Sequence, residues 1–288
     1  MNLLTQTIYS GLMSGGVYAL VGIGLVLAYR TSRVLNLTHG ESYVAAALTC
    51  ALLTEKGVPL WASMLAGLLA AMAVAVAVER LLLRPRTSWP IPSLILLTLA
   101  AAFVAKGVFL LVAGVDPLSF ERLLSGRPIR FAGGAMPRQG ALLIGVGLAT
   151  AVALTLFLAH TPIGRRLRAS AENPDAAQLM GVNVPMLRTL AFALSGALAG
   201  LAALLLVPLV AVDFQAGLGM TMRAFIAAAL AGMSPFLTIL TGFGLGLFEA
   251  AVTGYAGALA QDPVVFAVLI ALALWQSRGI RFGGSARA

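Results

Sequence analysis

Long apolar blocks separated by short polar segments run through the whole chain. A helix that crosses the roughly 30 Å hydrocarbon core of a bilayer needs about 20 apolar residues. Most of the blocks approach that length, whereas 222–232 is too short and is cut off from the next block by Ser234 and Pro235. The pattern predicts an all-α, polytopic membrane helix bundle of about eight or nine spans, including one short broken helix, in a single domain covering residues 1–288. The nine blocks are 8–29, 40–54, 60–78, 91–112, 140–159, 187–209, 222–232, 237–255 and 263–275.

The composition excludes an ordinary soluble domain. Hydrophobic residues make up 60% of the chain and charged residues only 10%, against about 25% charged in typical soluble domains. The first block has neither a basic segment before it nor a clear small-residue cleavage site after it, so we expect a retained helix and not a signal peptide.

Basic residues are distributed unequally between the polar segments. With the N-terminus outside and the spans alternating, the outer face receives Lys56, Arg122, Arg127, Arg130 and Arg138. Because Lys and Arg are enriched in cytoplasmic loops, the distribution predicts an outer N-terminus and a cytoplasmic C-terminus in the inner membrane. The net charge of +9 then reflects topology and attraction to anionic membrane lipid, and nucleic-acid binding is rejected. The inner face receives Arg30, Arg33, Arg80, Arg84, Arg86, Arg165, Arg166, Arg168, Arg188, Arg278, Arg281 and Arg287.

The polar segment 161–185 between two membrane blocks carries the signals of a short helix. Asn173 suits the N-cap, Pro174 the first helical position, Asp175 the positive helix end and Gly181 the helix stop. We expect a two-turn helix in a loop on the cytoplasmic side, with the spelling D-A-A-x-x-x-G.

The sequence lacks the motifs of ATP binding, of catalysis and of metal binding. The only lysines are Lys56 and Lys106, and no Gly-Lys pair exists, so the chain has no P-loop to hold the phosphates of ATP. Paired acids and nucleophile constellations are missing, so we expect no enzyme. His39 and His160 stand far apart, and no metal site or bound cofactor is expected. Cys50, the single cysteine, is interpreted as a structural thiol.

Polar residues interrupt the apolar sequence between the first two blocks. Asn36, Thr38, His39 and Glu41 lie there, and polar groups at membrane depth are costly unless they face a cavity or one another. The alternative is that this junction reaches the membrane surface, with Arg30 and Arg33 as anchors and Glu41 capping the second helix. The pairs Gly11 and Gly15, and Gly196 and Gly200, have the spacing that allows another helix to approach closely.

Three motifs in order resemble a known family. The D-A-A-x-x-x-G segment resembles the E-A-A-x-x-x-G loop of ABC importer permeases. The N-terminal pattern and the run Gly242, Gly246, Glu249 resemble the branched-chain amino-acid permease family, the first of the two membrane subunits in that importer class, and Arg223 stands where the family usually has lysine. The N-terminal match consists of Gly11, Gly16, Tyr18, Ala19, Leu20, Asn36, His39, Gly40 and Glu41.

The resemblance implies a membrane permease subunit of an ATP-driven importer for branched-chain amino acids or a related small polar solute. It implies a second permease subunit, two cytoplasmic ATPase subunits that bind ATP and Mg, and a periplasmic or surface solute-binding protein. The 161–185 loop would dock on the ATPase through Asn173, Pro174, Asp175, Ala176, Ala177, Met180 and Gly181.

The solute path would draw its polar groups from Tyr18, Asn36, His39, Glu41, Thr98 and Glu249. Lys106 and Glu249 are charges within apolar blocks, which either contact solute, pair with each other or lie at helix ends. The alternative function is a self-sufficient channel or secondary transporter, which inverted repeats would favour. The two halves show no convincing repeat.

Overall fold

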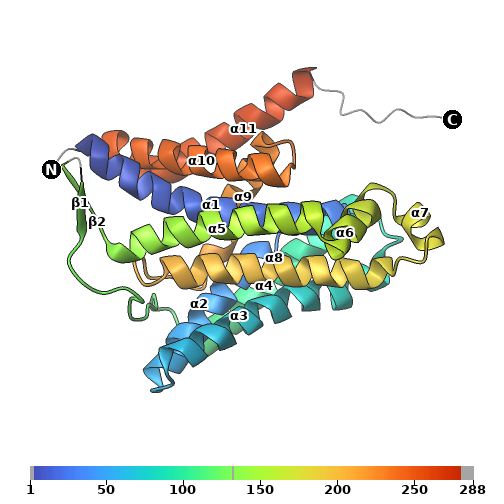
Figure 1. Ribbon diagram of the computed structural model, residues 1–288, viewed down its shortest axis with the longest axis horizontal. Coiled ribbons are helices and arrows are strands. Elements are labelled where there is room, and N and C mark those ends of the chain that lie inside the picture. Colours follow the sequence, from blue (N-terminus) through green and yellow to red (C-terminus); the bar gives the residue numbers. More distant parts are fainter. Residues whose placement is uncertain (1–2, 132, 280–288) are drawn as a thin grey trace.

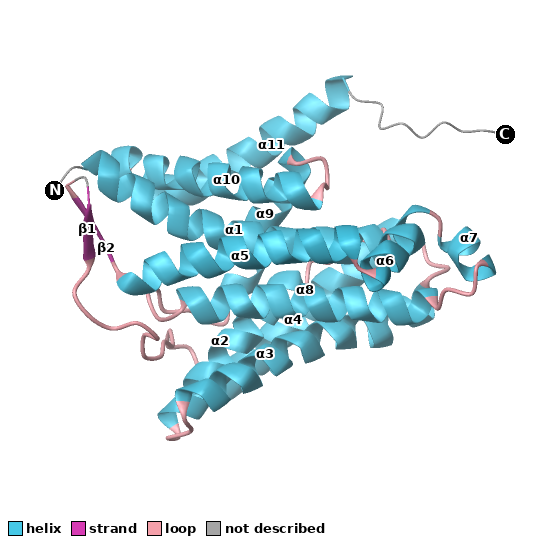
Figure 2. Cartoon of the chain, viewed as in Figure 1, coloured by secondary structure: helices cyan, strands magenta, loops and turns pink. Residues whose placement is uncertain are grey.

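A computed structural model describes residues 3–131 and 133–279 of the chain. Each of the nine apolar blocks forms a helix, which confirms the all-α bundle (Figure 1). Figure 2 shows how little of the chain lies outside helices. The corresponding helices are α1 (Leu3–Ser32), α2 (His39–Glu55), α3 (Leu60–Ala77), α4 (Ile91–Ala113), α5 (Arg138–His160), α8 (Val184–Leu206), α9 (Ala216–Leu230), α10 (Pro235–Ala256) and α11 (Gln261–Gly279).

Among the described residues, six helical segments are long and apolar enough to cross a membrane: α1, Leu60–Arg86, α4, α5, α8 and α10. The segment Leu60–Arg86 is α3 extended by a π-helical turn, Val78–Leu83, and a 3₁₀ turn, Arg84–Arg86. The helices α2 and α9 are shorter, at 17 and 15 residues. The helix at the block expected for 222–232 begins earlier, at Ala216. Its first residues, AGLG, are only weakly apolar, so the hydrophobic pattern did not include them.

The most deeply buried helix is α1, whose residues from Gly15 to Ala28 are almost all inaccessible. Glycines allow α10 to lie against it: a Cβ at Gly11 or Gly15 would collide with the backbone of Leu247 or Phe243. The second glycine pair, Gly196 and Gly200 on α8, packs in the same way against Ala71 on α3. Both pairs are thus helix-packing sites, as their spacing predicts.

The segment that follows α1 turns back into the bundle. The ring of His39, the first residue of α2, reaches the carbonyl oxygen of Val21. Val21 precedes Arg30 by nine residues, so it lies about 13 Å deeper along α1 at 1.5 Å per residue. Residues 33–38 therefore run inward, and α2 begins within the bundle and not at its surface.

The polar segment 161–185 contains two helices. The expected short helix is α7 (Pro174–Leu179), and it is preceded by α6 (Pro162–Glu172), which was not expected. The Thr161 hydroxyl caps α6 by accepting a hydrogen bond from the Gly164 amide at 3.0 Å. Both helices lie at one end of the bundle, whereas the start of α1 lies at the other end (Figure 1).

The polar loop between α4 and α5 carries the only strands found in the described residues. They are β1 (Ile129–Phe131) and β2 (Gly134–Met136), an antiparallel pair in which Ile129 faces Met136. This hairpin lies beside the start of α1 (Figure 1). The expected cytoplasmic arginines Arg281 and Arg287 lie outside the described residues.

Candidate functional site

The first turns of α2 and α9 meet inside the bundle. A Cβ at Gly40 would overlap the carbonyl oxygen of Gly217, so the two backbones touch. The Gly40 amide donates a hydrogen bond to the Thr221 hydroxyl at 2.7 Å. Only glycine at position 40 allows this approach, which explains the glycine after His39 in physical terms.

The carboxylate of Glu41 lies at this contact. Its side chain is wholly buried, and its oxygens lie against the Cα of Gly217. Neither oxygen has a hydrogen-bond partner among the described residues. Glu41 belongs to the first turn of α2 and packs on the first turn of α9. The positive ends of two helix dipoles therefore converge on the carboxylate, and these dipoles lower the cost of burying it.

The inward-running segment is held by threonines on neighbouring helices. The Leu37 amide donates to the Thr98 hydroxyl on α4 at 3.1 Å, and the Thr38 hydroxyl donates to the Thr98 carbonyl at 2.7 Å. The Asn36 side chain makes a hydrogen bond within the segment, because its Oδ1 accepts from the Thr38 amide at 3.0 Å. The structure thus brings Asn36, Thr98 and Glu41 together into what we call the polar junction.

His39 ties the polar junction to two other helices. Its Nε2 lies 2.9 Å from the Val21 carbonyl oxygen on α1, and its Nδ1 lies 3.1 Å from the Ser195 hydroxyl on α8. Because a carbonyl only accepts, Nε2 carries the proton and Nδ1 accepts from Ser195. His39 is 1% exposed and Asn36 is 3% exposed, whereas Arg30 and Arg33 are exposed. The junction is therefore buried within the bundle, while Arg30 and Arg33 reach the bundle surface as the alternative expects.

Tyr18 and Glu249 belong to a second polar cluster. The Tyr18 hydroxyl donates to Glu249 Oε2 at 2.5 Å, and Arg223 Nε on α9 lies 3.0 Å from Glu249 Oε1. Gln261 at the start of α11 donates to Glu249 Oε2 at 3.2 Å. Glu249 therefore pairs with Arg223 and not with Lys106.

Lys106 has different surroundings. Its ammonium nitrogen lies 5.7 Å from the centre of the Phe103 ring on the same helix. A charge is thus present on the sparsely covered helix α4.

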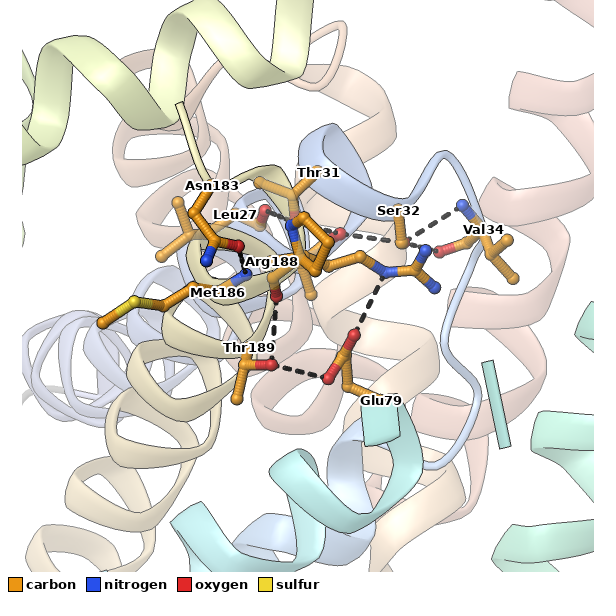
Figure 3. Close-up of polar contacts among 11 residues, drawn as sticks. Leu27, Thr31, Ser32, Val34, Glu79, Asn183, Met186, Arg188 and Thr189 are labelled. Carbon is orange, nitrogen blue, oxygen red and sulfur yellow. Dashed lines mark hydrogen bonds and ion pairs between the residues drawn. The ribbon is translucent and has the colours of Figure 1, made fainter. Parts of the chain in front are cut away.

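A third cluster was missed by sequence reasoning. Glu79, in the π-helical turn after α3, is wholly buried. Its Oε2 accepts from the Thr189 hydroxyl at 2.8 Å, and its Oε1 lies 3.6 Å from Arg188 Nε (Figure 3). Both partners lie in α8, the helix that follows α7, so the cluster joins α3 to α8. The sequence signal that could have indicated this cluster is the acidic residue Glu79 directly after the apolar block 60–78.

The expected docking segment has the predicted caps. Asn173 Oδ1 accepts from the Ala176 amide at 3.0 Å, and Gly181 adopts a φ of 78°. Leu179 and Met180 are 89% and 83% exposed, although they lie in a polar segment between two apolar helices. Ala177, in contrast, is 5% exposed and faces its own chain. Of the two alanines, only Ala176 is therefore presented outward, together with Pro174 and Asp175.

Metal-ligating residues are not clustered in the described part of the chain, where no group of three or more His, Cys, Asp or Glu could hold an ion. Cys50 is a free, buried thiol.

Comparison with known proteins identifies relatives along nearly the whole chain. Residues 7–274 match a family model described as the permease component of a branched-chain amino acid transport system. The high-affinity branched-chain amino acid transport system permease protein LivH of Salmonella typhimurium is 31% identical over 96% of this chain and 94% of its own length. The corresponding protein BraD of Pseudomonas aeruginosa is 29% identical over 96% and 94%. The autoinducer 2 import system permease protein LsrC of Yersinia pseudotuberculosis is 28% identical over 80% and 63%.

Solved structures show a related fold. PsaBC from Streptococcus pneumoniae, solved in complex with a Fab, matches with a TM-score of 0.53 and 15% identity, over 96% of this chain and 91% of that chain. An inward-facing metal-chelate type ABC transporter matches with a TM-score of 0.50 and 15% identity, over 93% and 85%. The chain is therefore an ABC importer permease subunit, a transport component and not an enzyme, and it belongs to the family of branched-chain amino acid transport system permease components.

Proposed function

We propose that this chain is driven by separate cytoplasmic ATPase subunits that dock on α7. The observation that carries the proposal is the exposure of Leu179 and Met180 on a capped helix at one end of the bundle. Exposed large apolar side chains on a polar segment mark protein interaction sites. The sequence has no P-loop of its own, so the ATP and Mg would be bound by those partners.

The same end of the bundle carries Arg30, Arg33 and the arginines of α6, which supports a cytoplasmic location for α7 in the inner membrane. The N-terminus and the β hairpin would then lie outside. A second permease subunit would complete the path, and an external solute-binding protein would deliver the solute. Lys106 favours this arrangement because a charge on a sparsely covered helix is costly in lipid and tolerable against protein or water.

For the solute, the names of LivH and BraD support a branched-chain amino acid. Such a solute combines a small apolar side chain with two charged groups, and a path for it needs apolar walls with a few polar groups. We assign the polar groups to the polar junction, where Asn36, Glu41 and Thr98 lie. Tyr18, His39 and Glu249 hold helices together in this arrangement, so their contribution to the path is indirect.

The proposal is tested by purifying the chain from its native membrane and reconstituting the complex in vesicles. An ATPase and a second permease should co-purify, and uptake of leucine, isoleucine or valine should require ATP. Solute flux through the purified chain alone would instead support the alternative of a self-sufficient channel or secondary transporter.

A further inference from the structure

A cavity of about 490 Å³ opens at the α7 end of the bundle, outside the polar clusters described above. It is bounded by the ends of α1 and α5, by α6, and by the turn that joins α9 to α10. We call it the basic cavity because Arg30, Arg33 and Arg168 line it, and Glu172 is the only acid in its lining.

Each of the three arginines is fixed by one hydrogen bond to a backbone carbonyl. Arg30 Nε donates to Met233 at 3.0 Å, Arg33 Nη2 donates to Ala171, and Arg168 Nη2 donates to Ala159 at 3.0 Å. A guanidinium has five N–H donors in a rigid fork. Each arginine is therefore oriented by one donor and keeps others for a ligand.

The backbone at the cavity is strained. Arg33 and Met233 both have a φ of 57°, and they are the only non-glycine residues with positive φ in the described part of the chain. Such conformations are uncommon for residues that carry a side chain, and they cluster at ligand and switch sites. Both residues line the basic cavity. The backbone conformation therefore indicates a binding site there, and this indication does not depend on the charge of the arginines.

The remaining lining is partly apolar. Leu27, Leu158 and Phe236 border the basic cavity, and Phe236 is 58% exposed. From Phe236 the exposed apolar surface continues along α10 through Leu237 and Leu240. A ligand of matching chemistry carries a phosphate group beside hydrocarbon, because arginines bind phosphate oxygens in charge-assisted hydrogen bonds and the apolar border suits acyl chains.

We propose that the basic cavity binds the phosphodiester headgroup of an anionic phospholipid, with an acyl chain along Phe236 and α10. The cavity lies between the ends of membrane helices, where basic pockets face lipid headgroups. In the proposed orientation the lipid belongs to the cytoplasmic leaflet, so only the choice of leaflet rests on the proposed function. By joining α1, α6 and the α9–α10 turn, the bound headgroup stabilises the base from which α7 projects.

The test is retention of lipid by the full chain in nanodiscs of phosphatidylcholine with a minor fraction of phosphatidylglycerol, followed by native mass spectrometry. The double variant Arg30→Gln/Arg168→Gln should retain phosphatidylglycerol roughly tenfold or more weakly, since each basic side chain contributes favourably near an anionic surface. The matched control is Arg165→Gln/Arg166→Gln. It also removes two positive charges, but from residues of α6 that do not line the cavity.

A second variant guards against misfolding. Glu172→Gln removes the only acid in the lining and should raise phosphatidylglycerol retention, a gain that a damaged protein would not show. The proposal is overturned if both double variants lose retention equally, if the parent protein retains no anionic lipid, or if Glu172→Gln lowers retention. Displacement of the lipid by millimolar inorganic phosphate would show a site for soluble phosphate and would overturn the assignment to lipid. None of these readouts requires transport, so failure here is distinct from failure of the proposed function.

Discussion

Arg223 and Glu249 form an ion pair inside the bundle, with Arg223 Nε 3.0 Å from Glu249 Oε1 and Glu249 only 2% exposed. Tyr18 and Gln261 donate to the same carboxylate. Four helices, α1, α9, α10 and α11, thus meet at one side chain. The pair also explains why a charge is tolerated in the middle of α10, since buried charges persist when they are paired and hydrogen-bonded.

We expect Glu249→Ala to lower the free energy of unfolding by about 3 kcal/mol or more, because it leaves a mostly buried guanidinium and two donors without this acceptor. Tyr18→Phe removes a single donor and should cost about 1 kcal/mol. Denaturant titration of the purified chain in detergent measures both. Equal and small losses in the two variants would show that the carboxylate does not organise these helices.

The glycines of α10 provide a packing test with a control on the same helix. A Cβ at Gly246 would collide with the backbone of Gly15 on α1, whereas a Cβ at Gly244 meets nothing within 4 Å. Gly246→Ala should therefore destabilise the protein by roughly 1–3 kcal/mol through overpacking. Gly244→Ala should be neutral or slightly stabilising because alanine favours the helix. Thermal unfolding curves compare the two, and similar behaviour would contradict the close approach of α1 and α10.

The Glu79 cluster predicts an asymmetry between its two charged members. Arg188→Gln leaves a wholly buried carboxylate without its counter-charge and should cost about 3 kcal/mol. Glu79→Gln should cost less than half of that, because the Arg188 side chain is 14% exposed whereas the Glu79 side chain is wholly buried. The double variant should recover stability relative to Arg188→Gln alone, and a double-mutant cycle measures the coupling. Additive losses would show that the two side chains do not interact.

Much of the fold could be predicted from the sequence because bilayer thickness fixes the length of apolar helices. The short helix α7 could also be placed, since Asn173 and Gly181 act locally. Helix α6 was missed because its face contacting the bundle is narrow, with Gly164, Leu167 and Ser170 buried among exposed arginines, and a polar stretch of that kind is easily interpreted as a loop.

The candidate site could be predicted only in part. The polar residues near Asn36 were expected to face a cavity or one another, and they are buried within the bundle. The position at which α2 begins depends on contacts with Val21 and Thr221, which are distant in sequence. The partner of Glu249 was also not predictable, because Arg223 precedes it by 26 residues. The inward orientation of Ala177 depends on how α7 packs on α6 and α8, which local sequence does not determine.

The docking of an ATPase on α7 is the central claim, and Leu179 is better placed to test it than Ala177, which is 5% exposed. Because Leu179 is 89% exposed, Leu179→Glu should change the stability of the chain by no more than about 0.5 kcal/mol. It should nevertheless weaken ATPase binding, since an unpaired charge would have to be buried at the interface. Leu259→Glu is the matched control, because Leu259 is 96% exposed and follows α10 near the opposite end of the bundle.

The most direct measurement is the amount of ATPase that co-purifies with each variant, normalised to the amount of permease in the membrane. We expect Leu179→Glu to lose most of the ATPase while it remains folded and inserted, and we expect Leu259→Glu to retain the ATPase at the level of the parent protein. Full retention by Leu179→Glu, or equal loss in both variants, would contradict docking through α7.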